Sequence, residues 1–195
     1  YEAFVGATGR SWSKPGFKQN PAHPAVNVSW VDAKAFCAWL TEREKNAGLL
    51  GASHEYRLPL DAEWSTAVGL PEETGRTAAE RIVHARSVYP WGTQWPPPKG
   101  AGNYGPNLNV DLHACTSPVG FFAPNPLGIY DLGGNVCEWC EDWHDGKQGA
   151  RVLRGASWYD IEPDLLLSSC RIRVRPEFAN DTFGFRVILA GGAPA

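Results

Sequence analysis

Cysteines are the most reactive side chains in this 195-residue chain, which contains five of them. Cys137 and Cys140 stand in the segment CEWC, and this C-x-x-C spacing occurs in zinc sites and in redox-active dithiols. A structural zinc site of this type takes a second C-x-x-C or a histidine pair, and the sequence offers neither. Cys37, Cys115 and Cys170 are scattered, and an odd total does not suit a secreted disulfide framework. We therefore expect Cys137 and Cys140 to be small buried side chains.

A second chemical feature is the recurrence of oxygen-bearing side chains and glycines in two turn-rich stretches, 103–113 and 131–138. Calcium takes six to eight oxygen ligands and mixes carboxylates, amides and backbone carbonyls. Backbone carbonyls in loops are free to bind a cation, whereas those in helices and strands already accept hydrogen bonds. Turns also favour Asn and Asp for their own geometry, so spacing alone leaves both alternatives open. The residues concerned are Asn103, Asn107, Asn109, Asp111, Asp131, Gly133, Gly134, Asn135 and Glu138.

Two helices are expected to position these stretches. The first runs from Ser29, which forms a capping-box pattern with Asp32, to a stop near Gly48. The second begins near Asp61, after a short strand and a proline, and turns Trp64 inward together with Ala67 or Val68. A third short helix is expected at 77–86. The inward face of the first helix consists of Ala33, Phe36, Cys37 and Leu40.

The remaining chain is loop-rich. Residues 1–28 are polar and rich in Pro and Gly, and residues 89–135 are dominated by turn residues. So long a stretch without regular structure needs another support, for which Trp packing and a bound cation are the two candidates. Short strands are expected in the segments RVLRG, CRIRV and FRVIL near the C-terminal end.

Composition limits the function. A net charge of -3 gives no nucleic-acid footprint, and no apolar run is long enough to span a bilayer. Because the chain has no Met and begins at Tyr1, we expect an excised piece of a longer chain and make no prediction of its location. Its length predicts one domain, residues 1–195.

The final segment, 151–189, holds an irregular, chemically mixed middle between strand-like ends. Such a middle is typical of a catalytic loop or of a binding face. The alternative is that Leu165, Leu166, Ile172 and Val174 are core residues of an ordinary sheet.

Several motifs occur together in one order: HPAVNVSWVDAKAFCAWL, YRLPLDAEW, YPWG, TSPVGFFAPNPLGIYDLGGNVCEW, RVLRGASW and GFRV. With them the chain resembles the formylglycine-generating enzyme (sulfatase-modifying factor) domain family, from about Asn20 to Leu189. The resemblance implies an α+β fold of the C-type lectin type, with a small twisted antiparallel sheet, two main helices and long ordered loops.

The resemblance also implies two structural calcium sites. One would use Asn103, the Tyr104 carbonyl, Asp111 and the His113 carbonyl. The other would use Asp131, Glu138 and the carbonyls of Gly134 and Val136. Asp131 stands where the family often has Asn, and a carboxylate suits a hard cation equally well.

The family's oxidase chemistry does not carry over. Oxidase members use two closely spaced cysteines, whose positions fall near Asp160 and Asp164 in this chain. Cys170 is a lone thiol beside Arg171, and a lone thiol does not form the paired-thiolate site. An enzymatic role would require Cys170 together with Asp142 and His144, which flank Trp143.

The middle of segment 151–189 is similar to the variable region of diversity-generating retroelement proteins. In that family, Asn codons are altered at adenines, and Tyr159, Asp160 and Ile161 are each one adenine change from Asn. Ser168, Arg171, Pro176 and the GFR at 184–186 hold frame places, whereas Ala156, Glu177 and the run LLL at 165–167 depart from the frame.

We therefore predict a non-catalytic module that presents segment 151–189 to a protein or other macromolecular ligand. The alternatives are an oxidoreductase of the formylglycine-generating type and an accessory domain of a larger enzyme. Arg154 and Arg186 are expected to satisfy loop carbonyls, and Trp139, Trp158 and Phe185 to be buried. The predicted ligand-binding residues are Tyr159, Asp160, Ile161, Glu162, Asp164, Leu165, Ile172, Val174, Phe178, Asn180 and Asp181.

Overall fold

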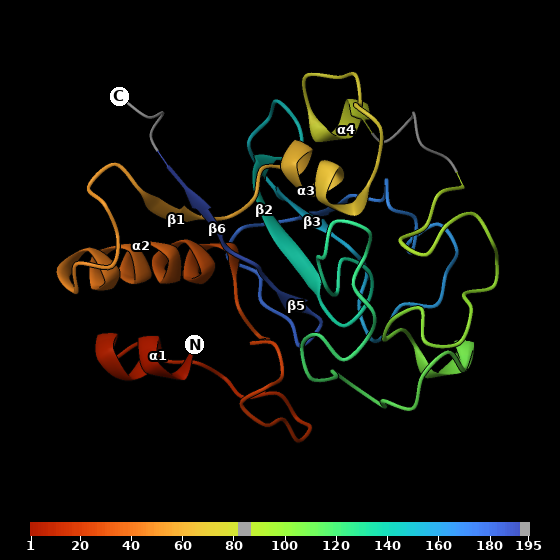
Figure 1. Ribbon diagram of the computed structural model, residues 1–195, viewed down its shortest axis with the longest axis horizontal. Coiled ribbons are helices and arrows are strands. Elements are labelled where there is room, and N and C mark those ends of the chain that lie inside the picture. Colours follow the sequence, from red (N-terminus) through yellow and green to blue (C-terminus); the bar gives the residue numbers. More distant parts are fainter. Residues whose placement is uncertain (82–86, 192–195) are drawn as a thin grey trace.

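The computed structural model describes residues 1–81 and 87–191, and Figure 1 shows their arrangement. The helices are α1 (Glu2–Thr8), α2 (Trp30–Asn46), α3 (Asp61–Val68), α4 (Ala78–Arg81) and the short 3-10 helix η1 (Pro106–Leu108). The strands are β1 (Glu55–Arg57), β2 (Cys137–Trp143), β3 (Arg151–Arg154), β4 (Ile172–Val174), β5 (Phe183–Gly184) and β6 (Ile188–Ala190). The α+β class expected from the sequence is confirmed.

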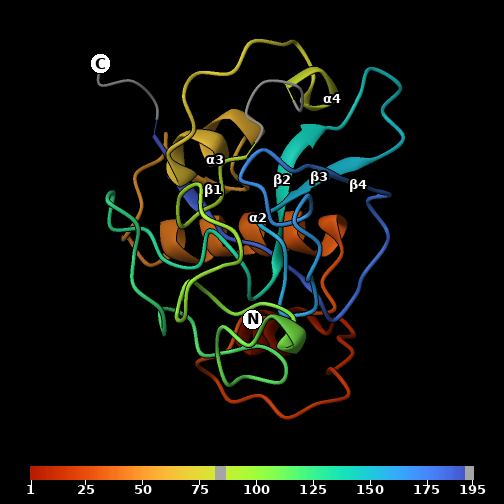
Figure 2. The same cartoon turned by 90° about the vertical axis from the view of Figure 1, so that its right-hand side faces the viewer.

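Two small sheets organise the molecule. One has four strands in the order β4-β3-β2-β5, and the other pairs β1 with β6. β3 runs antiparallel to both β2 and β4, whereas β5 runs parallel to β2. In Figure 1, α2 lies along the β1–β6 pair, α3 and α4 lie at one end of β2, and long loops fill the opposite side. Figure 2 shows these loops from the front. Most helices and strands therefore lie on one side of the molecule, and long loops form the other side.

The first predicted helix, α2, begins and ends as the sequence indicates. Ser29 Oγ accepts a hydrogen bond from the Asp32 amide at 3.1 Å, and the Asp32 carboxylate accepts one from the Ser29 amide at 3.4 Å. The helix ends before Gly48, whose φ of +70° suits a residue without a side chain. Ala33 and Cys37 are buried in the core as predicted, whereas Phe36 and Leu40 are half-buried.

One expectation needs correction, one strand was not predicted, and one predicted range is described only in part. Helix α1 lies in the polar stretch expected to be loop, because Phe4 is 1% exposed and packs on the rings of Phe36 and Trp39 at 5.6 Å. Strand β2 follows no alternating pattern in the sequence, because both of its faces are covered. The third helix extends over Ala78–Arg81, and the rest of the predicted range 77–86, after residue 81, lies outside the described residues.

The C-x-x-C pair lies on β2. Cys137 packs with Val28 and Ala33, whereas Cys140 packs with Trp64 in a different core cluster. Residues three apart on a strand point to opposite faces of the sheet, so the two thiols cannot converge on one ion. Both are buried and carry no disulfide, as the sequence predicts.

The turn-rich stretch 89–135 is supported by aromatic packing. Tyr89 and Trp91 stack with ring centroids 4.7 Å apart, and Trp91 meets Tyr104 edge-on at 5.3 Å. Tyr104 exposes none of its surface. One of the two expected supports is therefore present. Among the described residues, no helix is long and apolar enough to cross a membrane.

Candidate ligand-binding site

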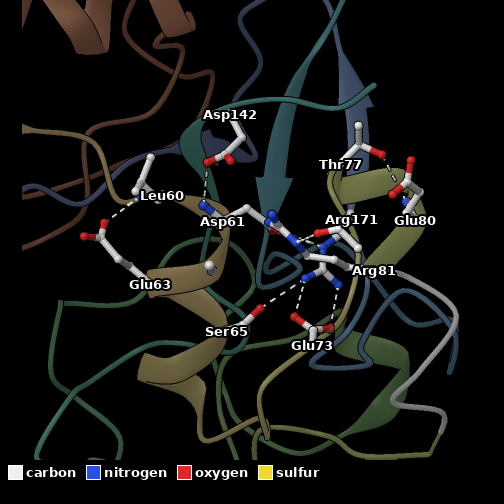
Figure 3. A network of polar contacts seen from close by, with 12 residues as sticks. Leu60, Asp61, Glu63, Ser65, Glu73, Thr77, Glu80, Arg81, Asp142 and Arg171 are labelled. Atoms are coloured by element: carbon white, nitrogen blue, oxygen red, sulfur yellow. Dashed lines mark hydrogen bonds and ion pairs between the residues drawn. The ribbon is translucent and has the colours of Figure 1, made fainter. Parts of the chain in front are cut away.

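Segment 151–189 rises from a buried network of ion pairs centred on Asp61, at the start of α3 (Figure 3). Asp61 is fully buried and accepts hydrogen bonds from Arg154, from Arg171 at 3.0 Å and from Arg81 at 2.9 Å. Burial alone would raise the pKa of Asp61, but the guanidinium groups of Arg154 and Arg171 outweigh it and hold that pKa below its usual value. Asp61 is therefore a charged anchor inside the fold.

The two arginines tie both ends of residues 155–170 to α3. Arg154 ends β3 and donates to the Ser168 carbonyl at 2.7 Å, so it also closes the segment on itself. Arg171 directly precedes β4 and donates to Glu73 at 2.5 Å and 3.0 Å. Figure 3 shows Arg171 between Asp61 and Glu73. The chain between the two arginines is thus held firmly at its base.

A glycine turn before β2 forms the second support. The Gly134 amide donates to the Gly155 carbonyl at 2.7 Å, and the Trp158 amide donates to the Asn135 carbonyl at 3.0 Å. Gly134 has a φ of +80°, and a Cβ there would lie 2.3 Å from the carbonyl oxygen of Asn103, so only glycine fits. The turn therefore joins loop 103–113 to the start of the candidate binding segment.

The exposed part of the segment consists of two limbs that meet at Trp158. Tyr159 is 69% exposed on the first limb, residues 159–164, and Phe178 is 50% exposed on the second, residues 175–181. The Trp158 indole nitrogen donates to the Asp181 carbonyl at 3.1 Å, which fastens the second limb to the first. We call the predicted ligand-binding residues that are exposed on these limbs the display face. It consists of Tyr159, Glu162, Asp164, Phe178 and Asn180, and the limbs also expose Pro163, Arg175, Glu177 and Ala179.

Several predicted face residues point inward and are removed from the set. Leu165, Ile172 and Val174 are half-buried and pack against the core, because their apolar side chains lie over the sheet and the Tyr104 cluster. Ile161 is half-buried against Gly105, where a Cβ would lie 2.3 Å from it. The alternative expectation of core residues therefore holds for Leu165, Ile172 and Val174, and Leu166 is buried in the same cluster as Leu165.

Asp160 and Asp181 also have structural roles. The Asp160 carboxylate accepts hydrogen bonds from the Ser157 amide at 2.8 Å and the Ser157 hydroxyl at 2.7 Å, and the Cys137 thiol lies 3.9 Å away. Asp181 is half-buried, and its carbonyl receives the Trp158 indole. Asp160 therefore positions the first limb.

The sequence did not indicate one neighbour of this face, Phe17. Its ring meets Trp158 edge-on at 5.3 Å, and Trp158 in turn meets Tyr159 at 5.8 Å. Phe17 lies in the N-terminal loop, 141 positions before Trp158 in the sequence. No local pattern in the sequence predicts a contact over that separation. Trp158 itself is half-buried, not buried as the sequence predicts.

The first predicted calcium set contains an unsatisfied buried oxygen. Asn103 is fully buried, and its amide nitrogen donates to the Cys115 carbonyl at 2.8 Å. Its side-chain oxygen accepts no hydrogen bond from the described residues. The Asp111 carboxylate accepts from the Tyr104 amide at 3.2 Å and the His113 amide at 2.7 Å. Buried polar atoms rarely stay unpaired, so the residues present fit a hard cation here.

The second predicted set already holds a cation, Arg186. Glu138 is 5% exposed and accepts from Arg186 at 2.5 Å through both oxygens, and from the Trp64 indole at 2.9 Å. Oε1 thus accepts one bond, which leaves a lone pair for a metal. Burial raises the pKa of Asp131, the other carboxylate of this set. The described residues contain no cluster of three or more His, Cys, Asp or Glu side chains that could hold a metal. Each predicted calcium set has fewer than three such side chains because two of its ligands are backbone carbonyl oxygens, and both sets stay predictions.

The acid–base pair considered for an enzyme is not formed. The Asp142 carboxylate accepts a hydrogen bond from the Asp61 amide at 2.6 Å and so caps α3. The described residues show no hydrogen bond between Asp142 and His144. His144 contributes its amide to the Ala150 carbonyl at the turn between β2 and β3. The Asp142 side chain and the His144 backbone thus serve the scaffold.

This arrangement defines a class of protein: an α+β domain in which ion pairs and a glycine turn hold an exposed loop. A family model described as the sulfatase-modifying factor enzyme 1-like domain matches residues 1–190. The chain therefore belongs to that family. The inactive C-alpha-formylglycine-generating enzyme 2 of Bos taurus is 33% identical over 94% of this chain and 57% of its own length. The formylglycine-generating enzyme of Streptomyces coelicolor is 30% identical over 94% of this chain and 59% of its own. The chain thus spans somewhat over half the length of these relatives.

Solved structures share the fold. PvdO from Pseudomonas aeruginosa has a TM-score of 0.68 and 26% identity, covering 97% of this chain and 75% of that chain. Treponema denticola variable protein 1 has a TM-score of 0.61 and 22% identity, covering 98% of this chain and 81% of that chain. At 22% identity, the second likeness concerns the fold alone. The C-type lectin type of fold predicted from the sequence is confirmed.

Proposed function

We propose that this domain is a non-catalytic ligand-binding module whose display face contacts a protein or other macromolecular partner. One observation carries the proposal: the loop has a fully buried, charged base and an exposed tip. Arg154 and Asp61 expose no side-chain surface, whereas Tyr159 is 69% exposed. A rigid frame with an exposed aromatic side chain loses little conformational entropy on binding.

The positions of the family's catalytic thiols support a binding role. Asp160 is engaged with Ser157, and Asp164 is exposed. Cys170 is half-buried, and burial raises the pKa of its thiol, which disfavours the reactive thiolate. A relative of this chain is named an inactive member of the enzyme family. The alternative role, oxidation of the formylglycine-generating type, would need a thiol site other than the one the family uses.

The sequence of the tip supports diversification by a retroelement. Tyr159 and its neighbour Asp160 are each one adenine change from Asn, and Glu162 and Asp164 stand on the same limb. Variation at the exposed positions would leave the base unchanged. The structural similarity to a variable protein is compatible with this proposal, but it supports the fold and not the diversification.

Calcium is proposed as a structural ion. Asn103 and Asp111 would hold it in the first set with the carbonyls of Tyr104 and His113. Asp131 and Glu138 would hold it in the second with the carbonyls of Gly134 and Val136. When bound, the ion would neutralise buried oxygens and stiffen loops 103–113 and 131–138.

The proposal is tested by selecting binders from a random peptide library on the immobilised domain. Each selected peptide is then measured against a tip variant in which Tyr159, Glu162, Asp164 and Phe178 are replaced by Ser. The matched control replaces two exposed leucines and two exposed acids near α2, β1 and β6, namely Leu49, Leu189, Glu42 and Glu55. We expect binding to be lost in the tip variant and kept in the control. Equal binding to both would refute a role for the display face.

A further inference from the structure

A cavity of about 450 Å³ lies in the N-terminal loop beside Phe17. We call it the N-terminal cavity. Its volume falls in the range of about 300–1,000 Å³ that ligand pockets occupy. None of its lining residues belongs to segment 151–189, so the cavity and the display face are separate in the sequence. Aromatic and proline side chains form most of its walls, namely Tyr1, Trp12, Phe17, Pro15, Pro21 and Pro24.

The loop around this cavity is held by side-chain hydrogen bonds. The Trp12 indole nitrogen donates to the Val26 carbonyl at 2.8 Å. Gln19 Nε2 donates to the Pro24 carbonyl at 3.0 Å and to the Thr116 hydroxyl at 2.9 Å. Walls that are already ordered lose little conformational entropy when a ligand enters. The N-terminal cavity is therefore pre-formed.

The side chains that line the cavity carry no unbalanced charge. Lys14 and Glu2 form an exposed ion pair, and the Lys14 ammonium lies 4.1 Å from the centre of the Trp12 ring. Burial lowers the pKa of His23, which favours its neutral form. Among the described residues, the lining contains no other Lys, Arg, Asp or Glu. The cavity therefore suits an uncharged, apolar side chain better than an ion.

Two contacts join the N-terminal loop to the two limbs of the display face. The Phe17 ring, in the cavity wall, meets Trp158 at 5.3 Å, and Trp158 meets Tyr159 at 5.8 Å. Asn27, near the end of this loop, donates its backbone amide to the Asn180 carbonyl at 2.9 Å. The N-terminal cavity and the display face therefore adjoin each other in the folded domain.

We propose that the protein partner of the display face also inserts an apolar side chain, aromatic or branched aliphatic, into the N-terminal cavity. This inference rests on the proposed function and adds a second contact site with its chemistry. Interfaces gain most of their binding energy from a few anchor residues that fill desolvated pockets. The aromatic walls offer such an anchor edge-on or offset-stacked contacts. Because the cavity lies outside segment 151–189, this contact would stay unchanged when residues of the display face vary.

The test uses the peptides selected on the domain whose binding depends on the tip. Ala3 is exposed on α1 and lines the cavity, so Ala3→Trp should fill it. The matched control is Ala7→Trp, at an exposed residue of the same helix that does not line the cavity. We expect Ala3→Trp to weaken binding at least about tenfold and Ala7→Trp to leave it unchanged. Thermal melting checks that each variant is folded.

A second measurement identifies the side chain that enters the cavity. Each residue of a selected peptide is replaced by Ala in turn. Replacement of the anchor should weaken binding at least about tenfold to the parent and to Ala7→Trp. It should have little effect on binding to Ala3→Trp, because there the cavity is already filled. A photoreactive analogue of leucine or phenylalanine at the anchor position should cross-link to residues 12–25.

The outcomes separate this inference from the proposed function. If tip-dependent peptides bind Ala3→Trp as well as the parent, or cross-link only to residues 159–181, the cavity is excluded and the display face remains. If the peptide residue that couples to Ala3→Trp is charged, the apolar anchor is wrong. If no selected peptide depends on the tip, the proposed function fails and this inference fails with it.

Discussion

Arg154 and Asp61 form an ion pair in which neither side chain exposes any surface to solvent. Arg154 also lies over the Trp64 ring at 4.3 Å and donates to Ser65 at 3.0 Å. The pair joins the end of β3 to the start of α3, so it fixes the point from which the display loop departs. Removal of one partner would leave the other charge buried and uncompensated.

Asp61→Asn should therefore lower the free energy of unfolding by about 3–5 kcal/mol. The matched control is Glu63→Gln, at a residue on the same helix as Asp61. It weakens the ion pair of Glu63 with Arg57 of β1, which is more exposed than the pair of Asp61 with Arg154. That change should cost at most about 1 kcal/mol. Chemical denaturation followed by tryptophan fluorescence measures both. Similar losses in the two variants would show that Asp61 is no anchor.

Acid stability should report the same network. The guanidinium groups of Arg154 and Arg171 hold the pKa of Asp61 low against the effect of burial, and Arg171 does the same for Glu73. A carboxyl whose pKa is lower in the folded state stabilises the fold above its unfolded pKa and loses that contribution as pH falls through its folded pKa. Unfolding should therefore become easier as pH falls below the ordinary pKa values of these two carboxyls, 3.8 for Asp61 and 4.5 for Glu73. Asp61→Asn should flatten this pH dependence. An unchanged slope would contradict the assignment.

Calcium should raise the melting temperature if the unpaired Asn103 oxygen and Asp111 bind it. An ion that binds only the folded state stabilises it by mass action, so the shift should grow with calcium concentration and disappear with a chelator. Asp111→Ala should remove the part of the shift that the first set contributes, and the exposed-site control Glu42→Ala should keep the whole shift. Elemental analysis without metal, together with no calcium dependence of melting, would exclude the site.

Copper-dependent oxidation should be absent. Neither Asp160 nor Asp164 supplies the thiol that oxidase members place nearby. We expect a cysteine-containing sulfatase-type peptide to be recovered unchanged after incubation with the domain and copper, as judged by mass spectrometry. The Cys170→Ser variant is the control. Turnover by the parent above this control would replace the binding role by an enzymatic one.

Sequence patterns predicted the elements whose signals are local. The Ser29–Asp32 capping box and the inward Trp64 of the second helix are set by neighbours in the chain, and both are found. Arg154 and Arg186 donate to loop carbonyls as expected. Their buried carboxylate partners were not predicted, because Asp61 lies 93 positions from Arg154 in the chain. Pairing over such separation leaves no periodic signal.

The candidate face was predicted too broadly for a related reason. A mixed sequence does not show which side chains turn inward. Ile172 and Val174 carry the same apolar chemistry that an interface uses, yet they cover the core on the short strand β4. Asp160 differs from Asp164 only in its place on the turn, where Ser157 captures its carboxylate.

The most direct test of the central claim is a melting scan of single substitutions along residues 154–181. Changes at Tyr159, Glu162 and Asp164 should stay within about 0.5 kcal/mol of the parent, as exposed positions do. Asp160→Ala should cost about 1–3 kcal/mol because it leaves buried donors unpaired. Arg171→Ala should cost about 3–5 kcal/mol because it leaves Asp61 and Glu73 with less compensation. If the exposed substitutions unfold the domain while Asp160→Ala and Arg171→Ala melt like the parent, the segment is core and the account of a fixed base with a separable display face is wrong.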